Sequence, residues 1–148
     1  MKRMLVIVAI AIVPLVVLPA VALTPTTTRG NVCGSSIGCG YMETFSGSYR
    51  FRGRTTPSLE GQIVRLRYRT VGEDRWYRFG DPGSKRAFIA KGGSFVRIGK
   101  GGRWNKEIFL NDYAGHPQTK WRMRARFRKQ DGYARSEVVV RVRVGYGD

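Results

Sequence analysis

The sequence has few of the residues that most catalytic and metal centres use. Its 148 residues include one histidine, two cysteines and ten acidic side chains. A nucleophile–histidine–acid triad would depend on His116, which lies in the turn-like GHPQ with no catalytic motif around it. Two thiolates and a distant histidine cannot complete a zinc site, and GKGG at 99–102 lacks the Ser/Thr and the helix of a P-loop. We therefore expect a non-catalytic protein without a metal or cofactor.

The first segment has the features of a secretory signal peptide. Two basic residues precede an uncharged apolar run from Met4 to Leu18, and AVA at 20–22 supplies the small-x-small pattern that signal peptidase cleaves. We predict a signal peptide over residues 1–22 and a secreted, extracellular or envelope-associated product. The alternative is an uncleaved anchor, because the apolar run extended to Leu23 reaches about 20 residues and could span a bilayer. No later stretch is apolar enough to do so.

The two cysteines, Cys33 and Cys39 in CGSSIGC, predict a disulfide in an exported protein. The bond closes a short loop, so it adds little stability and fixes a local turn. The surrounding residues 23–44 carry TPTTT and a glycine-rich run, and we expect them to form a flexible leader apart from the disulfide. The folded domain is then expected over residues 45–148.

From residue 45 onward, apolar and polar residues alternate in short runs separated by turn residues. QIVRLRYRTV places Val64, Leu66 and Tyr68 on one face and arginines on the other. The other such runs are SYRFRG, RWYRF, KRAFIA, SFVRI, KEIFL, KWRMRARFRK and SEVVVRVRV. Trp76 in RWYRF is the expected inward anchor, and no run has helical spacing with caps. The pattern predicts an all-β protein, an antiparallel β-sandwich of about seven strands.

Three segments carry a resemblance to a known family: GQIVRLRYRTVGEDRW, GGSFVRI and TKWRMRARFRKQDGYARSEVVVRVRV. They resemble the small immunoglobulin-like or fibronectin-type-III-like domains of secreted actinobacterial proteins, in their G-x-x-V-x-L-x-x-R…W hairpin, G-x-F strand, aromatic-R-x-R strand and closing S-x-x-V-x-V-x-V strand. The resemblance covers Phe45 to Val144 and implies an immunoglobulin-like sandwich that serves as a binding, adhesion or spacer module. The chain departs from the family pattern at Trp121, where tyrosine is commoner. The cysteine pair also lies outside the domain instead of joining its sheets.

Positive charge dominates the chain. It has 27 basic and 10 acidic side chains, a net charge of +17 that falls to +15 when Lys2 and Arg3 leave with the signal peptide. Such a charge favours anionic partners. Arginines alternate with apolar residues on three predicted strands. They are Arg65, Arg67, Arg69, Arg122, Arg124, Arg126, Arg128, Arg141 and Arg143.

If these three strands share one sheet, the last two joined by a hairpin at Asp131-Gly132, all nine guanidinium groups lie on one outer face. On such a face neighbouring strands are about 4.8 Å apart, and every second residue of a strand, pointing to the same side, is about 6.8 Å from the next. This spacing is on the scale of phosphates along a polyanion. We expect this face to bind an anionic polymer: a cell-wall polymer, an acidic polysaccharide or extracellular nucleic acid.

Other interpretations stay open. A solvated sheet face is polar in any case, so the arginines could serve only solubility and protection of the sheet edges. The chain would then be a protein-interaction or inhibitor-like module that binds through loops such as 99–105 or 111–118. A small secreted hydrolase is a third possibility, since scattered acids do not exclude a carboxylate pair. Most aromatic residues sit at inward positions, whereas Trp104, in the polar GGRWNKE, is the aromatic candidate for ligand contact.

Overall fold

The chain folds into β-strands that pack as two sheets. The computed structural model describes residues 20–34, 38–43, 48–111 and 120–145, and within them it contains nine strands and one short 3-10 helix. The strands are β1 (Thr27–Cys33), β2 (Tyr41–Glu43), β3 (Tyr49–Thr56), β4 (Ile63–Thr70), β5 (Phe88–Ala90), β6 (Phe95–Arg97), β7 (Arg103–Leu110), β8 (Lys120–Phe127) and β9 (Ser136–Gly145). The 3-10 turn, Lys100–Gly102, occupies the GKGG segment. The all-β prediction is confirmed, with more strands than the seven expected.

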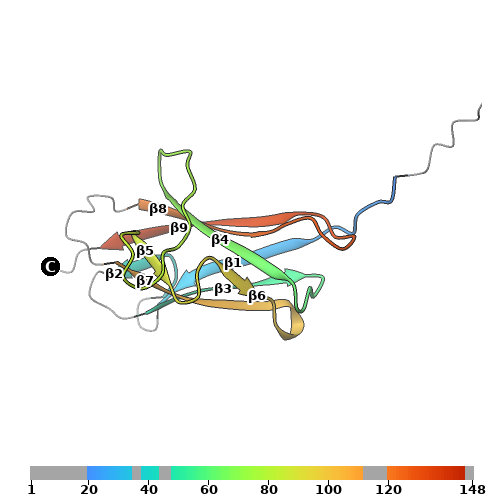
Figure 1. Ribbon diagram of the computed structural model, residues 1–148, viewed down its shortest axis with the longest axis horizontal. Coiled ribbons are helices and arrows are strands. Elements are labelled where there is room, and N and C mark those ends of the chain that lie inside the picture. The colour runs from blue at the N-terminus through green and yellow to red at the C-terminus, as the bar shows by residue number, and fades with distance from the viewer. Residues whose placement is uncertain (1–19, 35–37, 44–47, 112–119, 146–148) are drawn as a thin grey trace, which may run out of the picture.

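One sheet has four strands in the order β1-β3-β7-β5, and the other has five in the order β2-β9-β8-β4-β6. All neighbouring pairs are antiparallel except β2 and β9, which are parallel. Figure 1 shows the long strands β8 and β9 along one side of the molecule and β3 and β7 along the other. RWYRF is not a strand, because it joins β4 only through an isolated bridge between Tyr68 and Tyr77. Among the described residues, no helix is long and apolar enough to cross a membrane.

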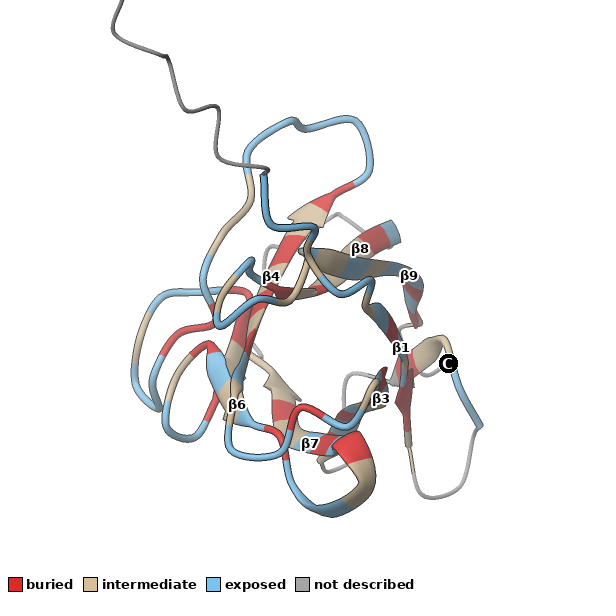
Figure 2. Ribbon diagram, turned by 90° about the vertical axis from the view of Figure 1, so that its right-hand side faces the viewer, coloured by how far each residue is buried: buried red, intermediate tan, exposed pale blue. Residues whose placement is uncertain are grey.

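The inward side chains of both sheets form a single core. Alternation along β4 and β8 buries Val64, Leu66 and Tyr68 against Met123 and Phe127. Figure 2 looks along the sandwich and shows buried and exposed positions alternating on its strands. This is the period of two that the sequence predicts for half-buried strands.

An aromatic cluster centred on Tyr68 ties the two sheets together. Phe88, on β5 of the four-stranded sheet, lies 5.1 Å from Tyr68 and 4.9 Å from Trp121 of the five-stranded sheet, measured between ring centroids, in edge-to-face geometry. Phe79 makes a further edge contact with Tyr68 at 5.3 Å between ring centroids. Burial raises the pKa of the Tyr68 hydroxyl above its usual value. The cluster therefore joins the two sheets through buried aromatic rings.

The segment expected to be a flexible leader, residues 23–44, instead contributes one strand to each sheet in its described residues. Its first strand, β1, pairs with β3 along all seven of its residues, and β2 lies parallel to the last strand. Just before β1, the Thr24 amide donates to the Gly132 carbonyl at 2.8 Å, and the Thr26 hydroxyl donates to the Ala134 carbonyl at 2.7 Å. The folded body therefore begins well before residue 45. Of the predicted signal peptide, residues 1–22, only the last three lie within the described residues.

The predicted disulfide between Cys33 and Cys39 is confirmed. Cys33 is the last residue of β1 and Cys39 lies just before β2, so the bond closes the loop where the chain passes from one sheet to the other. The expectation that the cysteine pair lies outside the domain is wrong, because both flanking strands belong to the sandwich.

Candidate anion-binding surface

The three arginine-bearing strands are neighbours in the five-stranded sheet. Across β4 and β8, Arg65 is opposite Arg126, Arg67 opposite Arg124, and Arg69 opposite Arg122. Arg122 is in turn opposite Arg141 of β9. The β8–β9 connection turns at Asp131 and Gly132, whose φ angles of 48° and 79° are those of a tight hairpin. The sequence therefore predicted correctly that these arginines share one outer face, and we call this surface the arginine face.

The guanidinium groups on this face crowd one another. Burial, followed by the charges of Arg78, Arg65 and other arginines, lowers the pKa of Arg67 below its ordinary value. The pKa of Arg124 is also lowered, first by burial and then by Arg126, against the opposing effect of Glu137. Like charges placed opposite each other on a sheet cost roughly 0.2–1 kcal/mol per pair. An anion placed between them would relieve this repulsion.

A small recess in the arginine face is lined by arginine side chains. Its volume is about 80 Å³. The lining residues are Arg65, Arg67, Arg124, Arg126 and Arg128. Guanidinium groups donate two parallel hydrogen bonds to phosphate or carboxylate oxygens, which makes such a cluster a suitable anion site.

Two acidic side chains partly neutralise this surface. Glu137 accepts a hydrogen bond from Nε of Arg126 at 2.7 Å, which is the contact expected from its register opposite Arg126. Asp74, fully exposed, lies 3.9 Å from Arg69. Within the described part of the chain, the guanidinium groups of Arg122, Arg128, Arg141 and Arg143 have no hydrogen-bonded or ion-paired partner. The face therefore keeps a large excess of positive charge.

Trp76 lies on the arginine face, and the prediction that it anchors the core is wrong. The guanidinium carbons of Arg124 and Arg69 lie 4.2 and 4.6 Å from its ring centroid, and Arg67 donates a long hydrogen bond of 3.5 Å to its carbonyl oxygen. Because RWYRF does not form a strand, alternation does not apply to it. The connection after β4 instead returns along the side of β4 that pairs with β6, where Tyr77 bridges Tyr68. From there the electron-rich indole stacks on the two cations.

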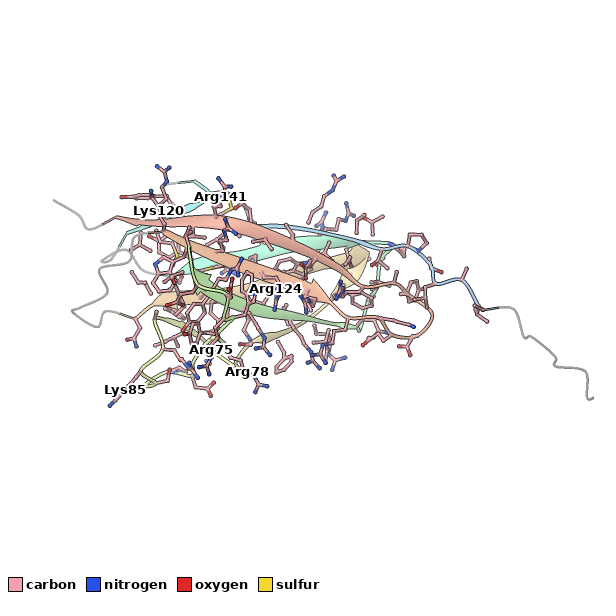
Figure 3. All side chains as sticks on the ribbon, turned by 90° about the horizontal axis from the view of Figure 1, so that it is seen from above. Arg75, Arg78, Lys85, Lys120, Arg124 and Arg141 are labelled. Carbon is pink, nitrogen blue, oxygen red and sulfur yellow. A yellow bond between two sulfur atoms is a disulfide. The ribbon has the colours of Figure 1, made fainter. Side chains whose placement is uncertain are left out.

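Two further residues of this surface escaped sequence reasoning. Phe95 is 44% exposed and lies 5.3 Å from the guanidinium of Arg65, because β6 turns its odd-numbered residues outward. Arg78, in the connection after β4, is close enough to lower the pKa of Arg67. Figure 3 shows Arg124 between two groups of basic side chains, Lys120 and Arg141 on one side of it and Arg75 and Arg78 on the other. Only the three-dimensional course of that connection places these residues here.

Trp104, predicted to be an exposed aromatic contact, is buried at 3% exposure. It lies on β7, which begins at Arg103, three residues before the predicted strand KEIFL. Its ring packs 5.2 Å from that of Phe51 and covers Gly30 and Gly53 on the neighbouring strands. The polar sequence around Trp104 gave the wrong signal, because the glycines that receive its ring lie far upstream.

Within the described residues, no cluster of three or more His, Cys, Asp or Glu side chains could hold a metal ion. His116 and most of the loop expected over residues 111–118 fall outside the described residues. No protein-family model matches the chain, and a search of curated proteins finds no relative. Any functional conclusion therefore depends on the chemistry of the surface itself.

Proposed function

We propose that the chain is an exported, non-catalytic module that binds phosphate-bearing polymers of the cell envelope through its arginine face. The observation that carries this proposal is the recess of about 80 Å³ lined by five arginines. Solubility needs charge spread over a surface, and it does not need five like charges around one hollow. An oxyanion in the recess would receive bidentate hydrogen bonds, and the unpaired arginines along β8 and β9 would contact the next phosphates of the chain.

The same proposal includes an immunoglobulin-like topology, as the resemblance to secreted actinobacterial domains implies. Constant-type immunoglobulin domains pair strands A, B, E and D in one sheet and C, F and G in the other. When β1, β3, β4, β5, β7, β8 and β9 are lettered A to G in chain order, the strand orders β1-β3-β7-β5 and β4-β8-β9 correspond to A-B-E-D and C-F-G. The departures are the two short edge strands β2 and β6, which extend the second sheet.

Binding to long-chain inorganic polyphosphate across a salt series tests the proposal. We expect affinity to fall steeply with salt, because each neutralised phosphate releases counterions. A triple variant, Arg67→Gln/Arg124→Gln/Arg128→Gln, should reduce the slope of log affinity against log salt by roughly 2–3. It should also weaken binding at least about tenfold, since one hydrogen bond to a charged group contributes about 1.5–3 kcal/mol.

The control variant removes the same charge elsewhere. Lys85, Lys91 and Lys100 are exposed and none of them lines the recess, so their change to Gln should alter binding much less. Polyglutamate serves as a carboxylate polymer and should bind more weakly than polyphosphate. If both triple variants lose affinity equally, or if the parent protein shows weak salt dependence, the arginines serve solubility and not binding. Loops such as 99–105 would then be the binding candidates. Isolated cell walls should behave like polyphosphate if the natural ligand is in the envelope.

Trp76 provides a local reporter of binding at this face. The other two tryptophans, Trp104 and Trp121, are buried at 3% and 5% exposure, whereas Trp76 is half-buried and stacked on Arg69 and Arg124. Polyphosphate that draws these guanidinium groups toward its oxygens should change the tryptophan emission. A Trp76→Phe variant should bind but lose most of that change. A response that persists in this variant would locate the ligand elsewhere.

A further inference from the structure

The opposite side of the sandwich carries a second basic surface. The four-stranded sheet turns its own arginines outward, and its register aligns them in rows across three strands. Arg29 of β1 is opposite Arg54 of β3, which is opposite Arg103 of β7. In the next row, Arg52 lies between Asn31 and Asn105. These six side chains are exposed.

A shallow groove of about 650 Å³ runs over these rows, and the six side chains contribute to its lining. The described residues that line the groove include no carboxylate. Arg54 donates from Nε to the Gly101 carbonyl at 2.8 Å, which fixes one guanidinium at the rim. Within the described part of the chain, the guanidinium groups of Arg29, Arg52 and Arg103 have no hydrogen-bonded or ion-paired partner. The asparagines add neutral amide groups that can donate to phosphate oxygens or accept from hydroxyl groups.

The groove is lined mainly by residues of the four-stranded sheet, with Arg97 of β6 at its edge, whereas the recess of the arginine face is lined by arginines of β4 and β8 and by Arg128 just after β8, so ligands in the two would be held apart. Packed sheets lie about 10 Å apart, and the outward side chains on both sides add to that distance. The Debye length at physiological ionic strength is about 8 Å. Two polyanion chains bound on opposite sides would therefore repel each other only weakly, and one need not displace the other.

We propose that the groove of the four-stranded sheet is a second binding site for phosphate-bearing polymer, and that the chain uses both sides to cross-link two polymer molecules. This inference rests on the proposed function of the arginine face and adds a bridging activity to it. The protein would then condense or tether the polymer, which a single binding face on a monomer cannot do.

A bridging assay tests the inference. Beads carrying polyphosphate are loaded with the purified protein, washed, and then offered fluorescent polyphosphate. We expect the parent protein to capture the labelled polymer. A groove variant, Arg29→Gln/Arg52→Gln/Arg103→Gln, should still load onto the beads and keep the Trp76 emission change, but should capture at least about tenfold less labelled polymer. All three side chains are exposed, so the variant should unfold at the same temperature as the parent.

The lysine variant at 85, 91 and 100 is the charge-matched control and should bridge like the parent. Bridging that survives in the groove variant would overturn the second site, since a dimer bound through two arginine faces would give that result. A parent protein that loads and shows the Trp76 response but captures no labelled polymer would overturn the inference alone. A parent protein that does not load at all would overturn the proposed function with it.

Discussion

Replacing Phe88 with alanine should lower the free energy of unfolding by about 3–5 kcal/mol, the range for deleting a fully buried aromatic ring. Phe88 is 0% exposed and makes edge-to-face contacts with Tyr68, Phe79 and Trp121 at 5.1, 6.4 and 4.9 Å. Two of these partners, Tyr68 and Trp121, belong to the opposite sheet. The substitution therefore opens a cavity where the sheets meet, and the loss is measured by urea denaturation followed by circular dichroism.

Phe95→Ala is the matched control, because it removes the same ring from the surface. Phe95 is 44% exposed and its ring contact is with the guanidinium of Arg65. Exposed cation–π contacts contribute about 0.5–1 kcal/mol, so the loss of stability should stay near that value. Similar losses in the two variants would mean that the aromatic cluster does not hold the sheets together.

The sequence predicts the strongly alternating strands well. β4, β8 and β9 carry an unbroken period of two over eight or more residues, so their inward faces and the positions of eight of the nine arginines follow directly, with Arg128 just beyond β8. The hairpin between β8 and β9 follows from Asp131-Gly132, since both positions require a positive φ. The shared arginine face was therefore predictable, but the recess within it was not, because its shape depends on side-chain positions across two strands.

The first strand escaped prediction for a specific reason. In TTRGNVC the inward positions are Thr28, Gly30 and Val32. Because two of these three residues are a threonine and a glycine, the sequence shows no apolar face that would predict a strand. The Trp104 ring covers the space that a side chain on Gly30 would need, with the nearest ring atoms 2.8 Å from the position of a Cβ. The hydrophobic partner of this strand is thus supplied from β7. The alternation within one strand cannot reveal that a ring from a distant strand fills the space beside its glycine.

The same packing predicts that Gly53→Ala is strongly destabilising, by about 3 kcal/mol, near the upper end for overpacking a core. A Cβ on Gly53 would overlap the backbone oxygen of Arg29 on β1 and ring atoms of Trp104 on β7. Neither obstacle can move easily, because the oxygen belongs to a paired strand and the indole is held against Phe51 at 5.2 Å between ring centroids. A methyl group there must push β1 away from β3 or expel the indole. Thermal and urea unfolding of the variant measure the loss.

Gly99→Ala provides the comparison, because Gly99 has an extended backbone with φ −95° and the nearest atom to its added Cβ lies at an ordinary 3.5 Å. The substitution should leave stability unchanged or raise it by up to about 1 kcal/mol, since alanine restricts the unfolded chain. A second readout separates the cause from a general defect. If the Gly53 variant expels the indole, the emission of Trp104 should shift toward that of a solvent-exposed tryptophan in the folded state. An unshifted emission together with parent-like stability would mean that Trp104 is not packed tightly against Gly30 and Gly53. The proposed reason why the β1 segment forms a strand would then be wrong.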